Sequence, residues 1–249
     1  MSTTLEEKLR LLYNYSACDV SDALLKLQKP VPGTPARAGH LADLTPYLQN
    51  HHHDHHPQSE TTTTTTKIIA PACTIKFTAK HAPETPPKND ETTTFPPGSH
   101  WVDCVDPDTI VVVDQPRDQH CAVVGGIMAL RMKRLGVQAA VVNGRVRDLA
   151  EFGECGLPVW ARGRSTVGSG AEAVAVARNV PVDVGGVVVY PGDIIFCDPV
   201  EGVVAIPRDL LDAVLELMPK LVAMDDRVKE AVGRGMLVSE AFKQFRTKI

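Results

Sequence analysis

Between residues 108 and 161 the chain alternates short apolar runs with helical patterns, and this alternation limits the possible folds more than any other feature of the sequence. Three buried strands are expected, over Ile110–Val113, Val137–Val142 and Leu157–Ala161. Two helices separate them: one covers residues 121–135, and the other follows the turn Asn143-Gly144 and runs through Cys155. Strands that alternate with helices in this way form βαβ units, so a parallel or mixed sheet covered on both faces is predicted.

Further strands are expected on both sides of this stretch. Lys67–Ala79 has a β-rich composition, and the chain after Gly170 forms short apolar runs divided by turn residues. These runs are Val174–Ala177, Val182–Val184, Val187–Val189, Ile194–Phe196 and Val203–Ile206. They favour an antiparallel or barrel-like part that completes the same domain.

Helices are predicted near both ends of the sequence. Residues 5–28 have helical spacing, and Ser16 and Asp19 are suited to cap a second helix where a first one ends. Asp209 is expected to cap a helix with an apolar stripe, and a last helix is expected over 238–246.

Two polar stretches, residues 45–66 and 81–98, interrupt these patterns. Residues 30–97 hold 11 of the 19 prolines and 14 of the 19 threonines of the chain. Such segments cannot bury enough apolar area to offset the entropy of ordering them, so one domain over 1–249 with two polar insertions is expected. The imidazoles of His51–His56 are potential ligands of transition metals, but a solvated loop is the favoured interpretation.

Charge and cysteine usage exclude several classes of protein. The formal net charge is −4, from 26 basic and 30 acidic residues, so a basic field for nucleic acid is not expected. The six cysteines form no C-x-x-C pair, which argues against a disulfide framework and a zinc ribbon. Neither a signal peptide nor an apolar run of roughly 18 residues is found, so a cytoplasmic protein without membrane contact is predicted.

Two short segments carry residues suited to a small oxo-acid: Gly125-Gly126-Ile127-Met128 at a helix start, and Arg147-Asp148 beyond a strand. The glycines leave backbone N–H groups open to an anion at the positive end of a helix. Asp148 offers a carboxylate to a hard cation such as Mg²⁺, and the planar fork of Arg147 suits a carboxylate or a developing enolate oxygen. A surface ion pair and an ordinary turn would account for the same residues, and their spacing alone does not decide.

Several motifs occur together and in a fixed order. They are Asp19–Leu24, Gly125–Ala129, Gly136-Val137, Val141–Asp148, Leu157–Gly163, Pro191–Ile195 and Gly202–Val204. From about residue 5 to residue 210 the chain resembles the regulator of ribonuclease activity A-like (RraA-like) family, interrupted by the two insertions. This family includes the class II 4-hydroxy-4-methyl-2-oxoglutarate aldolases, which also decarboxylate oxaloacetate.

The resemblance implies a compact α/β fold of the swivelling type, with a central β-sandwich or barrel flanked by helices. It also implies a homotrimer or homohexamer with active sites at subunit interfaces. In the family pattern Asp148 would bind Mg²⁺ or Mn²⁺, Arg147 would contact the substrate as a catalytic residue, and the backbone of Gly125, Gly126, Ile127 and Met128 would hold the pyruvyl portion.

The activity implied by the resemblance is that of a divalent-metal-dependent carbon–carbon lyase acting on small 2-oxo acids. Breaking the C3–C4 bond would leave a pyruvate enolate, whose charge the metal and Arg147 would stabilise in either reaction. Gly126 departs from many aldolases of the family, which carry an acid there. This departure concerns aldol cleavage, which needs a base, and not decarboxylation, which needs none. Asp198 or Glu201 of a neighbouring subunit is a candidate for the missing carboxylate.

The family also offers a function of another class. Its named regulator binds a ribonuclease, so the alternative is a non-catalytic, ring-shaped regulator that binds a ribonuclease or another protein. Gly168-Ser169-Gly170 lacks the pattern of a nucleotide loop, so no nucleotide cofactor is expected. For Asp114, Asp193 and Asp198, capping of strand ends and turns is the simplest expectation.

Overall fold

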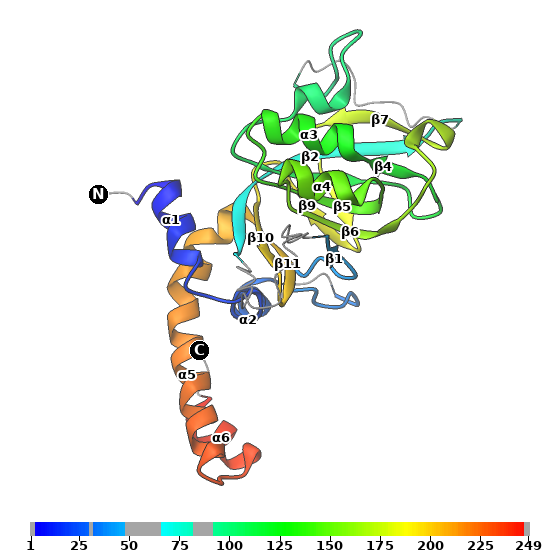
Figure 1. Ribbon diagram of the computed structural model, residues 1–249. Coiled ribbons are helices and arrows are strands. Elements are labelled where there is room, and N and C mark those ends of the chain that lie inside the picture. Colours follow the sequence, from blue (N-terminus) through cyan, green and yellow to red (C-terminus); the bar gives the residue numbers. More distant parts are fainter. Residues whose placement is uncertain (1–2, 30–31, 48–65, 82–91, 247–249) are drawn as a thin grey trace, which may run out of the picture.

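A mixed sheet of nine strands lies at the centre of the computed structural model, which describes residues 3–29, 32–47, 66–81 and 92–246 (Figure 1). The strand order is β1-β6-β5-β3-β2-β10-β11, with β4 paired to β5 and β7 paired to β2. The strands are β1 (Thr45–Pro46), β2 (Ile68–Ala79), β3 (Ile110–Asp114), β4 (Ala122–Val124), β5 (Ala139–Val146), β6 (Val159–Arg164), β7 (Ala173–Arg178), β10 (Ile194–Asp198) and β11 (Gly202–Ile206). A separate hairpin contains β8 (Val182–Val184) and β9 (Val187–Val189).

The long strand β2 bends the sheet toward a barrel. One edge pairs antiparallel with β10 over residues 68–71 and with β7 over residues 75–79, and the other edge pairs parallel with β3 over residues 72–76. The pairs β3–β5, β4–β5 and β5–β6 are parallel, whereas β10–β11 is antiparallel. The predicted α/β fold, with parallel units followed by an antiparallel, barrel-like part, is confirmed.

Alternate residues of the central strands enter two different cores. On β3, Val111 and Val113 join a cluster that α3 (Gly126–Arg134) and α4 (Leu149–Cys155) cover, whereas Ile110 and Val112 join a cluster under the β8–β9 hairpin. All four side chains are fully buried. Because β-strand side chains alternate between faces, a run of consecutive apolar residues marks a strand covered on both sides.

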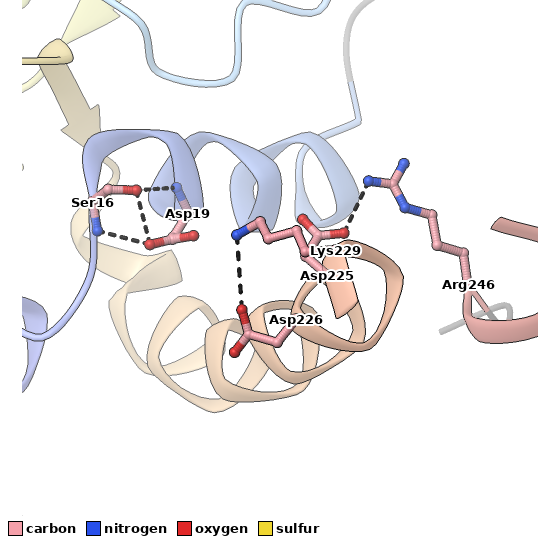
Figure 2. A network of polar contacts seen from close by, with 6 residues as sticks. All are labelled: Ser16, Asp19, Asp225, Asp226, Lys229 and Arg246. Atoms are coloured by element: carbon pink, nitrogen blue, oxygen red, sulfur yellow. Dashed lines mark hydrogen bonds and ion pairs between the residues drawn. The ribbon is translucent and has the colours of Figure 1, made fainter. Parts of the chain in front are cut away.

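The remaining helices form a separate layer over β10 and β11 (Figure 1). It consists of α1 (Leu5–Leu12), α2 (Ala17–Leu27) and α5 (Leu211–Gly233), and α6 (Val238–Phe245) packs on the far end of α5. Ser16 and Asp19 form the capping box of α2, as predicted (Figure 2). The last turns of α5 together with α6 project away from the sheet; we call residues 225–246 the helical arm.

Three local predictions are wrong. Residues 122–124 form β4, because this buried apolar run pairs with β5, and the helix begins only at Gly126. Asn143 and Gly144 lie inside β5, which continues to Val146 after an irregular register, instead of forming a turn. Asp209 lies in a 3₁₀ turn, and α5 begins after Leu210 without a side-chain cap.

The two insertions are described only in part. Thr45 and Pro46, at the start of the first stretch, form β1 on the edge of β6, and residues 92–98 of the second are turns and irregular segments. The cluster His51–His56 lies outside the described residues. Within the described ranges, none of the helices has the length and apolar character needed to cross a membrane.

Candidate active site

The predicted residues Arg147 and Asp148 directly follow the last residue of β5. Asp148 has left-handed backbone angles (φ 60°, ψ 45°) and stands at the N-cap position of α4, so the chain turns sharply there. Its Oδ2 accepts a hydrogen bond from the Gly126 N–H at 3.2 Å and lies 3.4 Å from Arg147 Nε. One carboxylate oxygen thus joins the two predicted segments, which are far apart in the sequence.

A pocket of about 120 Å³ opens beside this pair. The start of α3 lines it with Gly125, Ile127 and Met128. Arg147 and Asp148 line it after β5, and a separate loop contributes Gly168 and Ser169. Of the predicted substrate-binding residues, only Gly126 is not in contact with the pocket, because it is buried and its N–H is directed at Asp148.

Two glycines make room for the ion pair. A Cβ atom at Gly125 would lie 2.8 Å from Asp148 Oδ2, and one at Gly168 would lie 3.1 Å from Arg147 Nη1. A larger residue at either position would displace the side chains of the pair. Gly168 carried no signal for this role in the sequence, where its surroundings only resembled a nucleotide loop.

The electrostatics of the pocket favour an anion. The helix α3 begins at the pocket without an acidic residue in its own first turn, and Asp148 accepts only the first of its free N–H groups, that of Gly126. Arg147 adds a guanidinium whose side chain is 44% exposed, and Asp148 is 37% exposed. The second oxygen, Asp148 Oδ1, has no hydrogen-bond partner among the described residues.

Glu151 brings a second carboxylate to this position, which the sequence analysis missed. A Cβ atom at Gly126 would overlap the Glu151 carboxyl group, so that group occupies the space a side chain at residue 126 would take. Glu151 lies three residues after Asp148, on the first turn of α4, and is exposed. The three-residue spacing places Glu151 on the same helix face as Asp148, and this could be seen in the sequence. The contact of Glu151 with Gly126 could not, because it depends on how α3 and α4 pack.

A hard divalent cation fits this donor set, although the residues form no complete cage. Among the described residues, no three His, Cys, Asp or Glu side chains come together as a metal site. Mg²⁺ usually takes one or two carboxylates and keeps several waters, and Asp148 offers one carboxylate whose Oδ1 is not engaged by the described residues.

The other predicted acids lie elsewhere and cap backbone groups. Asp198 is buried and accepts hydrogen bonds from the N–H groups of Val200 and Glu201, and Asp193 accepts from Tyr190 and Arg208. Neither Asp198 nor Glu201 contacts the Arg147 pocket of its own chain.

The family model described as RraA-like (Aldolase/RraA) matches residues 17–205. The chain belongs to the RraA-like family. The match includes every residue of the pocket, and the RraA-like fold is the one expected from the ordered motifs.

Two relatives match half of the chain or more. A protein of Halalkalibacterium halodurans named "Putative 4-hydroxy-4-methyl-2-oxoglutarate aldolase" is 29% identical over 136 residues, 55% of this chain and 64% of that protein. Protein DlpA of Legionella pneumophila is 25% identical over 98% of this chain but only 34% of its own length. The chain therefore spans less than two thirds of each of these relatives.

A solved structure supports the same fold. RraAS2 of Streptomyces coelicolor, described as an unusual member of the RNase ES inhibitor RraA protein family, superposes with a TM-score of 0.64 at 24% identity. The superposition covers 95% of this chain and 100% of that one. At this identity the likeness concerns the RraA-like fold and not the activity.

Proposed function

We propose that this RraA-like protein is a divalent-metal-dependent carbon–carbon lyase that acts on small 2-oxo acids through a pyruvate enolate. One observation carries the proposal: the Arg147–Asp148 pair lies against the start of α3, where Asp148 accepts the Gly126 N–H, and lines a pocket of about 120 Å³. Relatives named as aldolases support a lyase at the level of the family.

The residues of the pocket suit the binding of a 2-oxo acid. Backbone N–H groups in the first turn of α3 and the guanidinium of Arg147 would bind the carboxylate and the C2 oxygen. When the C3–C4 bond breaks, its electron pair moves toward the C2 oxygen, and Arg147 would stabilise the negative charge that develops there. Mg²⁺ or Mn²⁺ held by Asp148 would supply Lewis-acid chemistry when bound.

Decarboxylation and aldol cleavage make different demands on the protein. Oxaloacetate loses CO₂ without any base, and the enolate then takes a proton at C3 to give pyruvate. In 4-hydroxy-4-methyl-2-oxoglutarate the C4 hydroxyl must lose its proton as the C3–C4 bond breaks, which yields one pyruvate and a pyruvate enolate. The enolate then takes a proton at C3 to give the second pyruvate. We propose Glu151 as the group that accepts this proton, because its carboxylate fills the space beside Gly126 where an acid is missing.

We further propose a homotrimer or homohexamer in which the segment 198–201 of one subunit approaches the pocket of another. Val200 in this segment is 74% exposed, as expected for a side chain that a neighbouring subunit covers. The mass of the protein in solution tests the assembly.

Pyruvate release tests the lyase. Wild type should form pyruvate from oxaloacetate with Mg²⁺, and chelator or Asp148→Asn should lower the rate at least about a hundredfold. Glu151→Gln should lower only the cleavage of 4-hydroxy-4-methyl-2-oxoglutarate. Glu154→Gln is the matched control, because Glu154 is an exposed acid on the same helix. Equal rates for wild type, Asp148→Asn and the chelated protein would contradict the proposal.

The helical arm favours a second candidate, a non-catalytic regulator that binds a ribonuclease or another protein. Leu237, Val238 and Phe242 of the arm are exposed apolar side chains that the lyase chemistry does not use. A protein of this kind would release no pyruvate from either substrate and would inhibit a ribonuclease in an RNA-cleavage assay.

A further inference from the structure

A second pocket, of about 240 Å³, is lined by three arginines. Arg117 follows β3, Arg145 lies near the end of β5, and Arg162 lies on β6. No residue lines both this pocket and the one at Arg147. We call it the arginine pocket.

Buried amides hold the walls of the arginine pocket in place. Asn143, 3% exposed, accepts a hydrogen bond from Arg162 Nε and donates to Asp114 Oδ1 and to the Asp183 carbonyl, each at 2.8 Å. Gln115, 2% exposed, accepts the Arg145 backbone N–H at 2.9 Å. Because these amides have several partners each, the backbone at Arg145 and the side chain of Arg162 are held in place before any ligand binds.

Two of the guanidinium groups converge on one point. A Cβ atom at Gly185, in the turn of the β8–β9 hairpin, would lie 2.8 Å from Arg162 Nη2 and 3.8 Å from Arg117 Nη2. Gly185 has φ +68°, so glycine is favoured there both for its backbone and for the space it leaves. Like charges brought together in this way repel each other, and an anion between them would remove the repulsion.

The protein's own acids compensate this charge only weakly. The closest ion pair joins Arg162 Nη1 to Asp43 Oδ2 at 3.5 Å, and the Asp43 side chain is 84% exposed. Arg145 Nη1 donates to the Arg164 carbonyl at 3.2 Å, and Arg117 has no hydrogen-bond or ion-pair partner within the part of the chain that the structure describes. In a chain with a formal charge of −4, this local excess of positive charge is not a general property of the surface.

We propose that the arginine pocket binds a small molecule with at least two negative charges, as carboxylates or phosphates. Planar guanidinium forks pair with either group through two parallel hydrogen bonds. The pocket is smaller than the roughly 300–1,000 Å³ of sites for drug-sized ligands, which fits a compact polyanion. The proposal does not depend on the lyase activity, because it concerns other residues.

Calorimetric titration of the full chain with citrate, pyrophosphate and acetate tests the proposal. Citrate or pyrophosphate should bind at one site per chain, with acetate at least about tenfold weaker, and the stronger of the two identifies the anionic group. Arg117→Ala should weaken binding about tenfold or more, because one charged hydrogen-bonding partner is lost. Arg117 is exposed, so this variant should keep the thermal unfolding midpoint of the unliganded protein.

Two arginine variants outside the pocket make the result decisive. Arg164→Ala removes an exposed arginine at the end of β6 and should leave the affinity within about twofold, and Arg147→Ala should do the same. Three results would overturn the proposal: no binding of either polyanion, equal weakening by Arg164→Ala, or loss of binding only with Arg147→Ala, which would place the anion in the candidate active site.

Discussion

The central sheet and the helical arm are held together in different ways. Strands β3 and β5 contribute fully buried side chains to a core on each face of the sheet, whereas the arm buries only Val228, Ala231 and Ala241. The sheet also buries polar groups, such as Asn143 and Gln115, with several hydrogen-bond partners each. The region that carries both pockets is therefore the rigid one.

The polar contacts of the arm lie near the surface instead. Figure 2 shows the ion pairs of Asp225 with Arg246 (2.9 Å) and of Asp226 with Lys229 (3.7 Å), close to the capping box of α2. Exposed pairs of this kind contribute between zero and about 1 kcal/mol each. Substitutions in the sheet should therefore cost stability, whereas substitutions in the arm should cost little.

The largest effect on stability is expected at Phe196 in the sheet, and Phe242 in the arm provides the comparison. Phe196 on β10 is fully buried between the sheet and the helical layer, so Phe196→Ala should lower the free energy of unfolding by about 3–5 kcal/mol through a cavity. Phe242 on α6 is 38% exposed, and Phe242→Ala should cost about 1 kcal/mol or less. Urea unfolding measures both. Equal losses would show that the arm is as tightly integrated as the sheet.

A second substitution separates activity from stability within the sheet region. Arg147→Lys keeps the charge but loses the planar fork, so the rate of pyruvate release should fall about tenfold to a hundredfold. The free energy of unfolding should change by less than about 1 kcal/mol, because the side chain is 44% exposed. Arg164→Lys is the control for both measurements. A large loss of stability would mean that Arg147 serves the fold and not the chemistry.

The sequence allowed the strands of the sheet to be predicted because two-sided burial produces consecutive apolar residues, as in Ile110–Val113. It did not reveal that β5 continues through Asn143 and Gly144. The partners that keep Asn143 in the strand, Asp114 and Asp183, are 29 and 40 residues away along the chain. Local turn propensity is strong at Asn-Gly, and only these distant contacts override it.

The candidate site was predictable to a similar degree. Arg147, Asp148 and the residues around Gly125 were identifiable by residue type and by resemblance. Glu151 and Gly168 were not, because their contacts with Gly126 and Arg147 depend on the packing of α3 against α4 and on the course of a loop. A correct list of elements does not contain this information.

A smaller effect, which depends on pH, is expected at Asp114 beside the arginine pocket. Burial raises the pKa of this carboxyl above its ordinary value of 3.8; the nearby Asp183 adds to the rise, and hydrogen bonds from Asn143 and the Asp183 backbone and the charge of Lys76 oppose it. As pH rises through the interval between the two pKa values, the unfolded chain releases the proton before the folded one. The free energy of unfolding contributed by Asp114 therefore falls with pH.

Asp114→Asn should remove this loss while keeping an acceptor for the Asn143 amide. The variant should thus gain stability relative to wild type as pH rises from below 3.8 toward neutrality. Urea unfolding of both proteins over a series of pH values gives the difference directly. A difference that stays constant with pH would contradict the prediction.

The smallest effect is expected in the arm, at Arg246. Its guanidinium pairs with Asp225 and lies 3.9 Å from the centre of the Phe242 ring, but the side chains of the ion pair are 47% and 33% exposed. Arg246→Ala should lower the free energy of unfolding by about 1 kcal/mol or less. The electrostatic part should shrink in 1 M salt, where the screening length falls to about 3 Å.

Arg234→Ala provides the comparison for Arg246→Ala, because the one ion pair of Arg234 among the described residues is with Glu230 one helical turn away, at 3.0 Å. The free energy of unfolding should fall by less than with Arg246→Ala, about 0.3–0.5 kcal/mol, since no aromatic ring of the described segments lies under this guanidinium. Arg246 differs because it links α6 to α5 across the arm, so its removal tests whether α6 depends on that link. A loss of 3 kcal/mol or more, roughly that of a buried ring, would show that the arm and the sheet unfold as one unit and that the contrast between them is wrong.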